Sequence, residues 1–120
     1  MSTHSSFSID EVSSVIVVRF DETDLLGTAG EIMLAELAPL VDRRRPQALL
    51  FDFQHVKTFG SSLLGCLVRL KKYLDPLEIS IKLCALPVPL RDVCGILNLT
   101  ENVFQTFDSV STALLDTRAR

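Results

Sequence analysis

Residues 48–65, ALLFDFQHVKTFGSSLLG, join two different hydrophobic patterns. The first part, 48–53, is a short and nearly continuous apolar run, which is typical of a strand covered on both faces. From Leu63 the spacing changes, because leucines then stand at 63, 67, 70 and 74, the i, i+4, i+7, i+11 stripe of an amphipathic helix. A buried strand followed directly by such a helix is typical of a parallel α/β sheet.

The segments on either side continue this alternation of strands and helices. On the N-terminal side, the patterns predict a strand hairpin at 7–12 and 15–20 and a helix over 28–41, with the apolar face Ile32, Met33, Leu37, Leu40 and Val41. On the C-terminal side, they predict a half-buried strand over 79–83, a helix from Pro89 to Leu97 and a strand over 103–107. A last helix is expected to begin after a cap at Asp108 or Ser109 and to end at Leu115. Residues 116–120 are expected to be a frayed polar tail. The predicted fold class is α/β in the order ββαβαβαβα, with a mixed sheet of about four to five strands and about four helices.

Composition indicates one domain over residues 1–120, with a core over about 7–115. The chain has 12 basic and 15 acidic side chains, a net charge of -3 and 48% hydrophobic residues, which excludes intrinsic disorder for most of its length. No apolar run approaches the roughly 18–20 residues that cross a bilayer, and the N-terminus is polar, so a cytoplasmic protein without membrane insertion is expected. The acidic balance argues against a nucleic-acid partner and favours a protein partner.

Residue types that carry catalysis or hold metals are sparse. The three cysteines and two histidines show no zinc-ligand spacing, so no metal site is expected, and the cysteines are expected to be buried reduced thiols. Asp52, His55 and Ser61 are the residue types of a hydrolase triad, but Ser61 does not stand in the G-x-S-x-G elbow that positions such a nucleophile. We therefore expect a protein that is not an enzyme.

The adjacent hydroxyls Ser61 and Ser62, at the start of the second predicted helix, have two interpretations. A serine at the N-cap accepts hydrogen bonds from otherwise unpaired backbone N–H groups, which contributes about 1 kcal/mol. Alternatively, one serine is a phosphoacceptor, because a phosphate at a helix N-terminus meets free N–H groups and the positive end of the helix dipole. A loop–helix corner on a rigid scaffold suits such a switch.

The same window resembles the signature of STAS domains, the module of sulfate transporter tails and anti-sigma factor antagonists. Bacterial regulatory members carry D-S-S-G-L-G after a short strand, and residues 60–65 here read G-S-S-L-L-G. The resemblance extends to LFDFQHV at 50–56 and to LRDV, LNL and VFQTF at 90–93, 97–99 and 103–107, so that it covers nearly the whole chain. Gly60 stands in place of the family's aspartate, and Leu63 stands in place of its glycine.

The resemblance implies an anti-sigma factor antagonist in which Ser61 is the phosphorylated residue. In the family cycle, the unmodified antagonist sequesters an anti-sigma factor that is also a serine kinase, phosphorylation releases the antagonist, and a serine phosphatase resets it. The kinase brings its own ATP and magnesium, so no cofactor is expected in this chain. The implied partner-binding residues lie in the loop over 21–26 and at the corner, namely Glu22, Asp24, Thr58, Phe59, Gly60, Ser62, Leu63 and Leu64.

Several alternatives stay open from the sequence. Asp24 or Thr28 could simply cap the following helix, and at least two of the apolar residues at the corner could point into the core. The missing aspartate at Gly60 favours a second function, a STAS accessory or scaffold subunit of a lipid-transport ATPase complex or a stress-signalling assembly, without phosphorylation. An anion or nucleotide pocket at the 60–65 helix start and association into a homodimer stay open as well.

Overall fold

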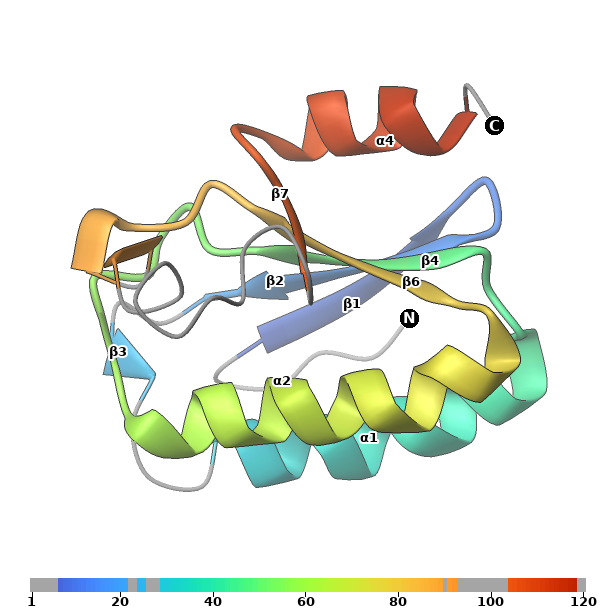
Figure 1. The fold of residues 1–120 in the computed structure, drawn as a ribbon, viewed down its shortest axis with the longest axis horizontal. Helices are drawn as coiled ribbons and strands as arrows, with labels where there is room; N and C mark the ends of the chain where they lie inside the picture. Colours follow the sequence, from blue (N-terminus) through green and yellow to red (C-terminus); the bar gives the residue numbers. More distant parts are fainter. Residues whose placement is uncertain (1–6, 22–23, 26–28, 90, 93–103, 119–120) are drawn as a thin grey trace.

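The chain folds into a mixed sheet with helices on both faces, in the residues 7–21, 24–25, 29–89, 91–92 and 104–118 that the computed structural model describes. The elements are β1 (Phe7–Val12), β2 (Val15–Phe20), β3 (Asp24–Leu25), α1 (Ala29–Arg44), β4 (Ala48–Asp52), β5 (Thr58–Phe59), α2 (Ser61–Leu74), a 3-10 turn (Asp75–Leu77), β6 (Ser80–Cys84), β7 (Gln105–Phe107) and α4 (Val110–Arg118). The main sheet has the order β1-β2-β4-β6-β7, and β3 pairs with β5 separately (Figure 1). The β1–β2 pair is antiparallel, whereas the β2–β4, β4–β6 and β6–β7 pairs are parallel. This mixed sheet confirms the predicted α/β class.

The opening hairpin has the boundaries that the sequence predicts. β1 and β2 stay in register as far as Val12 opposite Val15, which leaves Ser13 and Ser14 as a two-residue turn. Both serines have positive φ angles, 48° and 68°. This is the backbone of a type I′ turn, which asparagine and glycine adopt at the lowest cost.

Replacing Ser13 with asparagine and Ser14 with glycine is expected to raise the free energy of unfolding by about 1 kcal/mol or more, because each left-handed non-glycine residue costs about that much. The change keeps the backbone carbonyl of residue 14, which accepts a hydrogen bond from the Gln47 N–H at 2.8 Å. Equilibrium urea unfolding followed by circular dichroism measures the difference. An unchanged or lower unfolding midpoint would show that the turn holds no such strain.

Each face of the main sheet has its own hydrophobic core. α1 and α2 lie together on one face and α4 lies on the other (Figure 1). On β4, Leu49 and Phe51 belong to the larger core with the buried faces of α1 and α2, whereas Ala48 and Leu50 belong to the smaller core with Ala113 of α4. All residues of β4 are buried, which confirms the prediction of a strand covered on both faces.

The helices that cover the larger core follow the predicted patterns, with two differences. The leucine stripe of α2 is buried as predicted. α1 ends at Arg44 rather than at 41, and the cations Arg43 and Arg44 in its last turn suit the negative end of the helix dipole. The prediction that Ile32 belongs to the core is wrong, because its side chain is 42% exposed. Met33 and Leu37 form the buried stripe of α1, and Ile32 lies beside that stripe.

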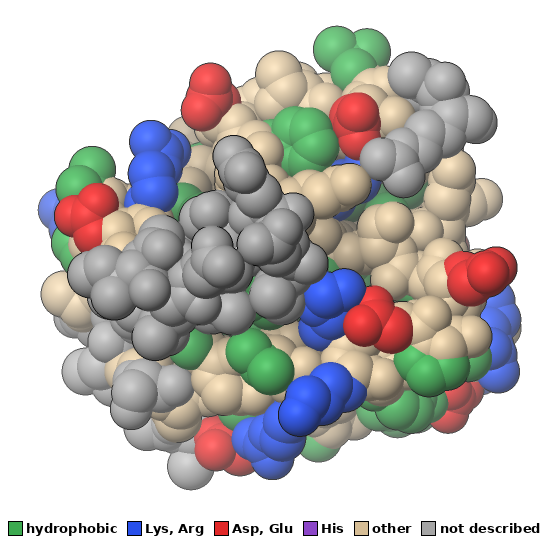
Figure 2. All heavy atoms as spheres, in the orientation of Figure 1, with side chains coloured by type: hydrophobic (Ala, Val, Ile, Leu, Met, Phe, Trp, Pro, Cys, Tyr) green, Lys and Arg blue, Asp and Glu red, His purple; other side chains and the backbone are tan. Residues whose placement is uncertain are grey.

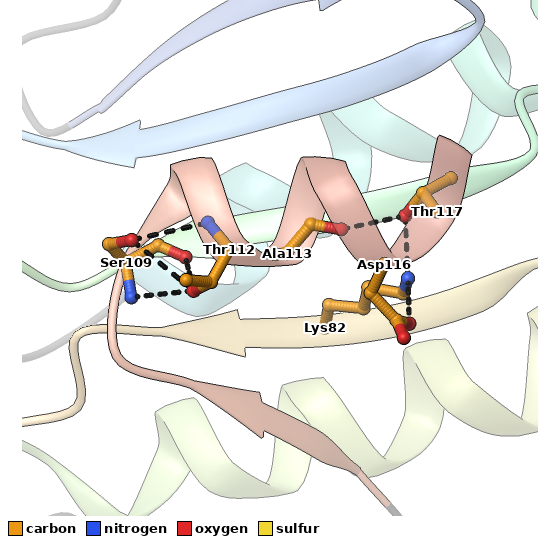
Figure 3. A network of polar contacts seen from close by, with 6 residues as sticks. All are labelled: Lys82, Ser109, Thr112, Ala113, Asp116 and Thr117. Atoms are coloured by element: carbon orange, nitrogen blue, oxygen red, sulfur yellow. Dashed lines mark hydrogen bonds and ion pairs between the residues drawn. The ribbon is translucent and has the colours of Figure 1, made fainter. Parts of the chain in front are cut away.

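Strand β6 differs from the prediction of a half-buried strand, because α2 and α4 cover its two faces. Only Ser80 of this strand is partly exposed. Lys82, at a polar position of the sequence alternation, is 1% exposed. Its Nζ donates to Asp116 Oδ2 at 2.8 Å and to Thr117 Oγ1 at 2.5 Å (Figure 3). The same Nζ lies 5.3 Å from the ring centroid of Phe107.

These contacts also correct the prediction of a frayed C-terminal tail. α4 continues to Arg118 instead of ending at Leu115, since its last turn holds the buried lysine. At the other end of α4, Ser109 Oγ accepts a hydrogen bond from the Thr112 N–H at 3.2 Å (Figure 3). Ser109 is therefore the cap, one of the two residues predicted for that position.

Other expectations concern the remaining helix, the thiols and the membrane. The helix predicted from Pro89 to Leu97 lies mostly outside the described residues, and so does Cys94. Cys66 and Cys84 are buried and free, which confirms the prediction for these two thiols. Within the described ranges, the helices are all too short or too polar to cross a bilayer.

Candidate functional site

The candidate site is the corner where β5 meets α2. β5 ends at Phe59, Gly60 is the N-cap of α2 with an extended backbone (φ -93°, ψ 157°), and the helix begins at Ser61. The N-cap position makes no side-chain capping hydrogen bond. The interpretation that a serine occupies the N-cap is therefore wrong, because Gly60 holds that position and Ser61 is the first helical residue.

The open start of α2 favours negative charge. The first N–H groups of a helix have no partner within it, and they carry the positive end of the helix dipole. The N–H of Leu63 is bonded to the Gly60 carbonyl at 3.1 Å. The first turn of α2 contains no acidic residue that would occupy this field. A phosphate on a hydroxyl at this position would therefore be stabilised by the helix.

A second segment lies beside the corner through backbone pairing. β3 runs parallel to β5, with Asp24 opposite Thr58 and Leu25 opposite Phe59. This pairing brings the backbone of Asp24 and Leu25 to the corner, which is the neighbourhood that the family resemblance implies for this loop. The sequence alone gave no strand signal here, because each strand of this pair has only two residues.

The structure separates the predicted contact residues at the corner into two groups. Thr58 and Ser62 are exposed, and Gly60 is partly exposed. Leu63 and Leu64 are 2% and 8% exposed, because both belong to the leucine face that packs α2 against the sheet. The prediction that these two side chains contact a partner is therefore corrected: both are core residues, which is the alternative that the sequence left open.

The loop residues have less complete descriptions. Asp24 belongs to β3 and α1 begins only at Ala29, so Asp24 does not cap that helix. Glu22 and Thr28 lie outside the described residues, as do the side chains of Asp24, Phe59 and Ser61, whose backbone alone is described. The contact roles of these side chains stay predictions.

Close packing of α1 on α2 supports the corner from the core side. A Cβ atom on Gly30 would lie 2.7 Å from Cys66 Sγ, so only glycine lets the start of α1 approach α2 this closely. The same Sγ atom accepts a hydrogen bond from Arg69 Nη2 at 3.1 Å. In the sequence, Gly30 carries only a weak signal, because a glycine within a helical pattern is tolerated and points at most to a packing reason.

Gly30→Ala is expected to lower the free energy of unfolding by about 1–3 kcal/mol, because the added methyl group overlaps a packed side chain. Cys66→Ala removes the sulfur atom, so the alanine at position 30 should cost much less in that background. Urea unfolding of the two single variants and the double variant measures this coupling. Equal losses in both backgrounds would mean that the two residues do not press on each other.

The residue types of a hydrolase triad have other partners. Asp52 Oδ1 accepts from the Gln54 N–H at 3.0 Å, Asp52 Oδ2 lies 3.7 Å from Arg19 Nε, and His55 is an exposed turn residue. Burial, with a smaller contribution from the Asp52 carboxylate, raises the pKa of Cys84 to about 12, so this thiol stays protonated at neutral pH. Among the residues that the structure describes, no three His, Cys, Asp or Glu side chains gather as a metal site would require.

Comparisons with known proteins relate nearly the whole chain to one family. The family model of the STAS domain matches residues 6–113. The anti-sigma factor antagonist SpoIIAA in its unphosphorylated form gives a TM-score of 0.81 at 18% identity, covering 95% of this chain and 97% of that chain. The Bacillus cell fate determinant SpoIIAA in its phosphorylated form gives 0.74 at 17% identity, covering 95% and 99%. The murine anion transporter Slc26a9 gives 0.73 at 16% identity, covering 92% of this chain and 19% of that chain. Comparison with curated protein sequences gave no match.

Proposed function

Because the chain belongs to the STAS domain family, we propose that it is an anti-sigma factor antagonist that binds an anti-sigma factor serine kinase and is released when Ser61 is phosphorylated. In this proposal the protein is cytoplasmic and has no catalytic activity, it regulates sigma-factor-dependent transcription, and a serine phosphatase returns it to the binding form. Its fold matches that of SpoIIAA over nearly the full length of both chains, and SpoIIAA exists in a phosphorylated form.

The observation that carries the proposal is the position of Ser61 as the first residue of a helix whose N-cap is a glycine. A phosphate adds about -1.5 to -2 charges at neutral pH. The first turn of α2 can hold this charge, whereas a partner packed on the corner would have to bury it. Gly60 has no side-chain carboxylate, so no negative charge at the N-cap position repels a phosphate on the next residue.

The partner surface follows the exposed side of the corner. Thr58 and Ser62 are exposed, and so is Gly65, where an added Cβ atom would meet nothing within 4 Å. Gly65 stands four residues after Ser61, so the two positions share one side of the helix. A partner that reaches Ser61 along α2 therefore passes over Gly65.

The charge distribution suits a protein partner. Figure 2 shows acidic and basic side chains interspersed over one face of the molecule, rather than gathered by sign. The chain as a whole has a net charge of -3. Nucleic-acid binding depends on clustered cations that neutralise phosphates, and this mixed, mildly acidic surface does not favour it.

Gly65→Gln tests the partner surface separately from phosphorylation. The longer side chain has room in the free protein and replaces a helix-interior glycine, so stability is expected to stay equal or rise. Binding to a kinase-type anti-sigma factor from the same genome, measured by isothermal titration calorimetry, is expected to weaken at least about tenfold, which corresponds to about 1.4 kcal/mol. Thr106→Gln, at an exposed position of the edge strand β7, is the matched control and should bind like the wild type. Wild-type affinity for Gly65→Gln would place the partner elsewhere.

A second function is favoured by Gly60 and by the likeness to a transporter. A STAS accessory subunit of a lipid-transport ATPase complex or a stress-signalling assembly would bind constitutively, and the missing carboxylate at position 60 removes one contact for a kinase or phosphatase. Slc26a9, an anion transporter, contains a region similar to this chain. Co-purification with a transporter ATPase that Ser61→Glu leaves unchanged would favour this second function over the first.

A further inference from the structure

The corner that carries Ser61 lies between two buried side chains. Val56, before the corner, is 3% exposed, and Leu63, after it, is 2% exposed. Residues 57–62 run between these two anchors, and β5 within them pairs with β3. The leucine face of α2 fixes the second anchor against the sheet. The position of the first anchor, Val56, therefore decides where the exposed part of the corner lies.

A short turn after β4 positions Val56. The connection from β4 to β5 consists of residues 53–57. The Phe53 N–H is bonded to the Cys84 carbonyl of β6 at 2.9 Å, and the Val56 N–H is bonded to the Phe53 carbonyl at 3.0 Å. Phe53 is itself buried in the larger core. The turn is therefore attached to the sheet at its start and closed by a backbone hydrogen bond at its end.

The side chain of Asp52, the last residue of β4, also bonds this turn. Its Oδ1 accepts from the N–H of Gln54, two residues further on, at 3.0 Å. Aspartate and asparagine shape turns in this way, because their side-chain oxygen takes the place of a backbone acceptor. Asp52 is 8% exposed, and its Oδ2 lies 3.7 Å from Arg19 Nε on the neighbouring strand β2. One carboxylate oxygen therefore shapes the turn, and the other is paired with a cation of the sheet.

From these contacts we propose that Asp52 is a positioning residue for the corner. Its bond to the Gln54 N–H keeps the turn after β4 in one conformation, which holds Val56 in the core and places β5 and Ser61 for a partner. Binding depends on close complementarity between two surfaces, so a looser turn weakens it even in a protein that stays folded. The contact of the corner with a partner rests on the proposed function, whereas the position of the corner in the free protein does not.

Amide hydrogen exchange of the nitrogen-15-labelled full chain tests the positioning without a partner. The Leu63 N–H, which is bonded to the Gly60 carbonyl at 3.1 Å, reports on the corner. Asp52→Ala removes the acceptor of the Gln54 N–H. Exchange at Leu63 is expected to rise at least about fivefold more than exchange at Val17 in the buried strand β2, because local loosening adds to any global loss of stability. An equal rise at both amides, or no rise at Leu63, would overturn the proposal.

Two further variants separate the turn from the ion pair with Arg19. Asp52→Asn keeps an oxygen that accepts from the Gln54 N–H, so exchange at Leu63 should stay within about twofold of the wild type. Asp10→Ala is the matched control, because it removes the other carboxylate of Arg19, at 3.0 Å, from a strand that does not adjoin β4. It should leave exchange at Leu63 unchanged. A rise in Asp52→Asn or in Asp10→Ala as large as in Asp52→Ala would assign the effect to the ion pair and contradict the proposal.

Isothermal titration calorimetry with a kinase-type anti-sigma factor that binds the wild type measures the effect on the partner. Asp52→Ala is expected to weaken binding at least about fivefold, whereas Asp52→Asn should weaken it by about twofold at most. Wild-type affinity of Asp52→Ala would contradict the positioning role and leave the proposed function intact. If no such factor binds the wild type, the proposed function fails, and the exchange rates at Leu63 alone decide whether Asp52 positions the corner.

Discussion

Replacing both partners of Lys82, Asp116 with alanine and Thr117 with valine, is expected to lower the free energy of unfolding by roughly 2–4 kcal/mol. The lysine is 1% exposed, and leaving a buried charge without its partner typically costs about 3–5 kcal/mol. The side chain of Asp116 is 40% exposed, so water already weakens its ion pair with Lys82. The expected loss of stability is therefore toward the lower end of that range of about 3–5 kcal/mol. Urea unfolding of the wild type and the double variant measures the difference.

A third substitution, Lys82→Met, shows whether the charge causes this loss. An apolar side chain of similar length leaves no ammonium to desolvate, and it still packs between β6 and α4. Adding Lys82→Met to the double variant is therefore expected to restore most of the lost stability. If the triple variant were no more stable than the double variant, lost packing of α4 rather than an unpaired charge would be the cause.

Ser61→Glu is expected to weaken binding to the anti-sigma factor kinase by about 100-fold or more. A charge without a partner inside an interface costs several kcal/mol, and about 1.4 kcal/mol corresponds to tenfold in Kd. The free protein should be as stable as the wild type, because an acidic residue in the first turn of a helix suits the helix dipole. Isothermal titration calorimetry measures the affinity, and thermal unfolding checks the fold.

Ser61→Gln is the matched control for this charge. Glutamine has the size and shape of glutamate but is neutral, so it should bind much more tightly than Ser61→Glu. Equal weakening by glutamate and glutamine would assign the effect to size rather than to charge. Wild-type affinity for Ser61→Glu would contradict the proposed release by phosphorylation.

Local patterns predicted most of the fold because they are set by neighbours in the sequence. The two-residue spacing between 7–12 and 15–20 leaves room only for a tight turn, and the hairpin has these bounds. The apolar run at 48–53 predicted a strand buried on both faces, and the leucine stripe from Leu63 predicted α2. The helix order followed, because parallel strands require crossover connections.

Features that depend on contacts between distant segments escaped the sequence analysis. Lys82 looked like a polar position of a half-buried strand, since its partners Asp116 and Thr117 come from a helix far along the chain. The pairing of β3 with β5 has too few residues to produce a periodic signal. Capping by serine was the common pattern at helix starts, and only the backbone of Gly60 showed that the N-cap lies one residue earlier.

At the candidate site, the backbone arrangement agrees with the resemblance better than the exposure of the side chains does. Backbone pairing brings Asp24 and Leu25 beside Thr58 and Phe59, the neighbourhood that the resemblance to the family implied. Leu63 and Leu64 stand beside the predicted phosphoacceptor, where an exposed apolar patch would suit a partner, but the helix stripe buries them. Where a signature and a helical stripe overlap, burial against the sheet determines which residues remain for a partner.

The phosphorylation state of Ser61 tests the central claim most directly. The purified protein is incubated with kinase-type anti-sigma factors from the same genome and Mg-ATP, and its intact mass and the modified residue are determined by tandem mass spectrometry. We predict one added phosphate, located at Ser61, present in Ser62→Ala and absent from Ser61→Ala. A stable complex that leaves the wild type unphosphorylated, or a phosphate located at another residue, would contradict the claim.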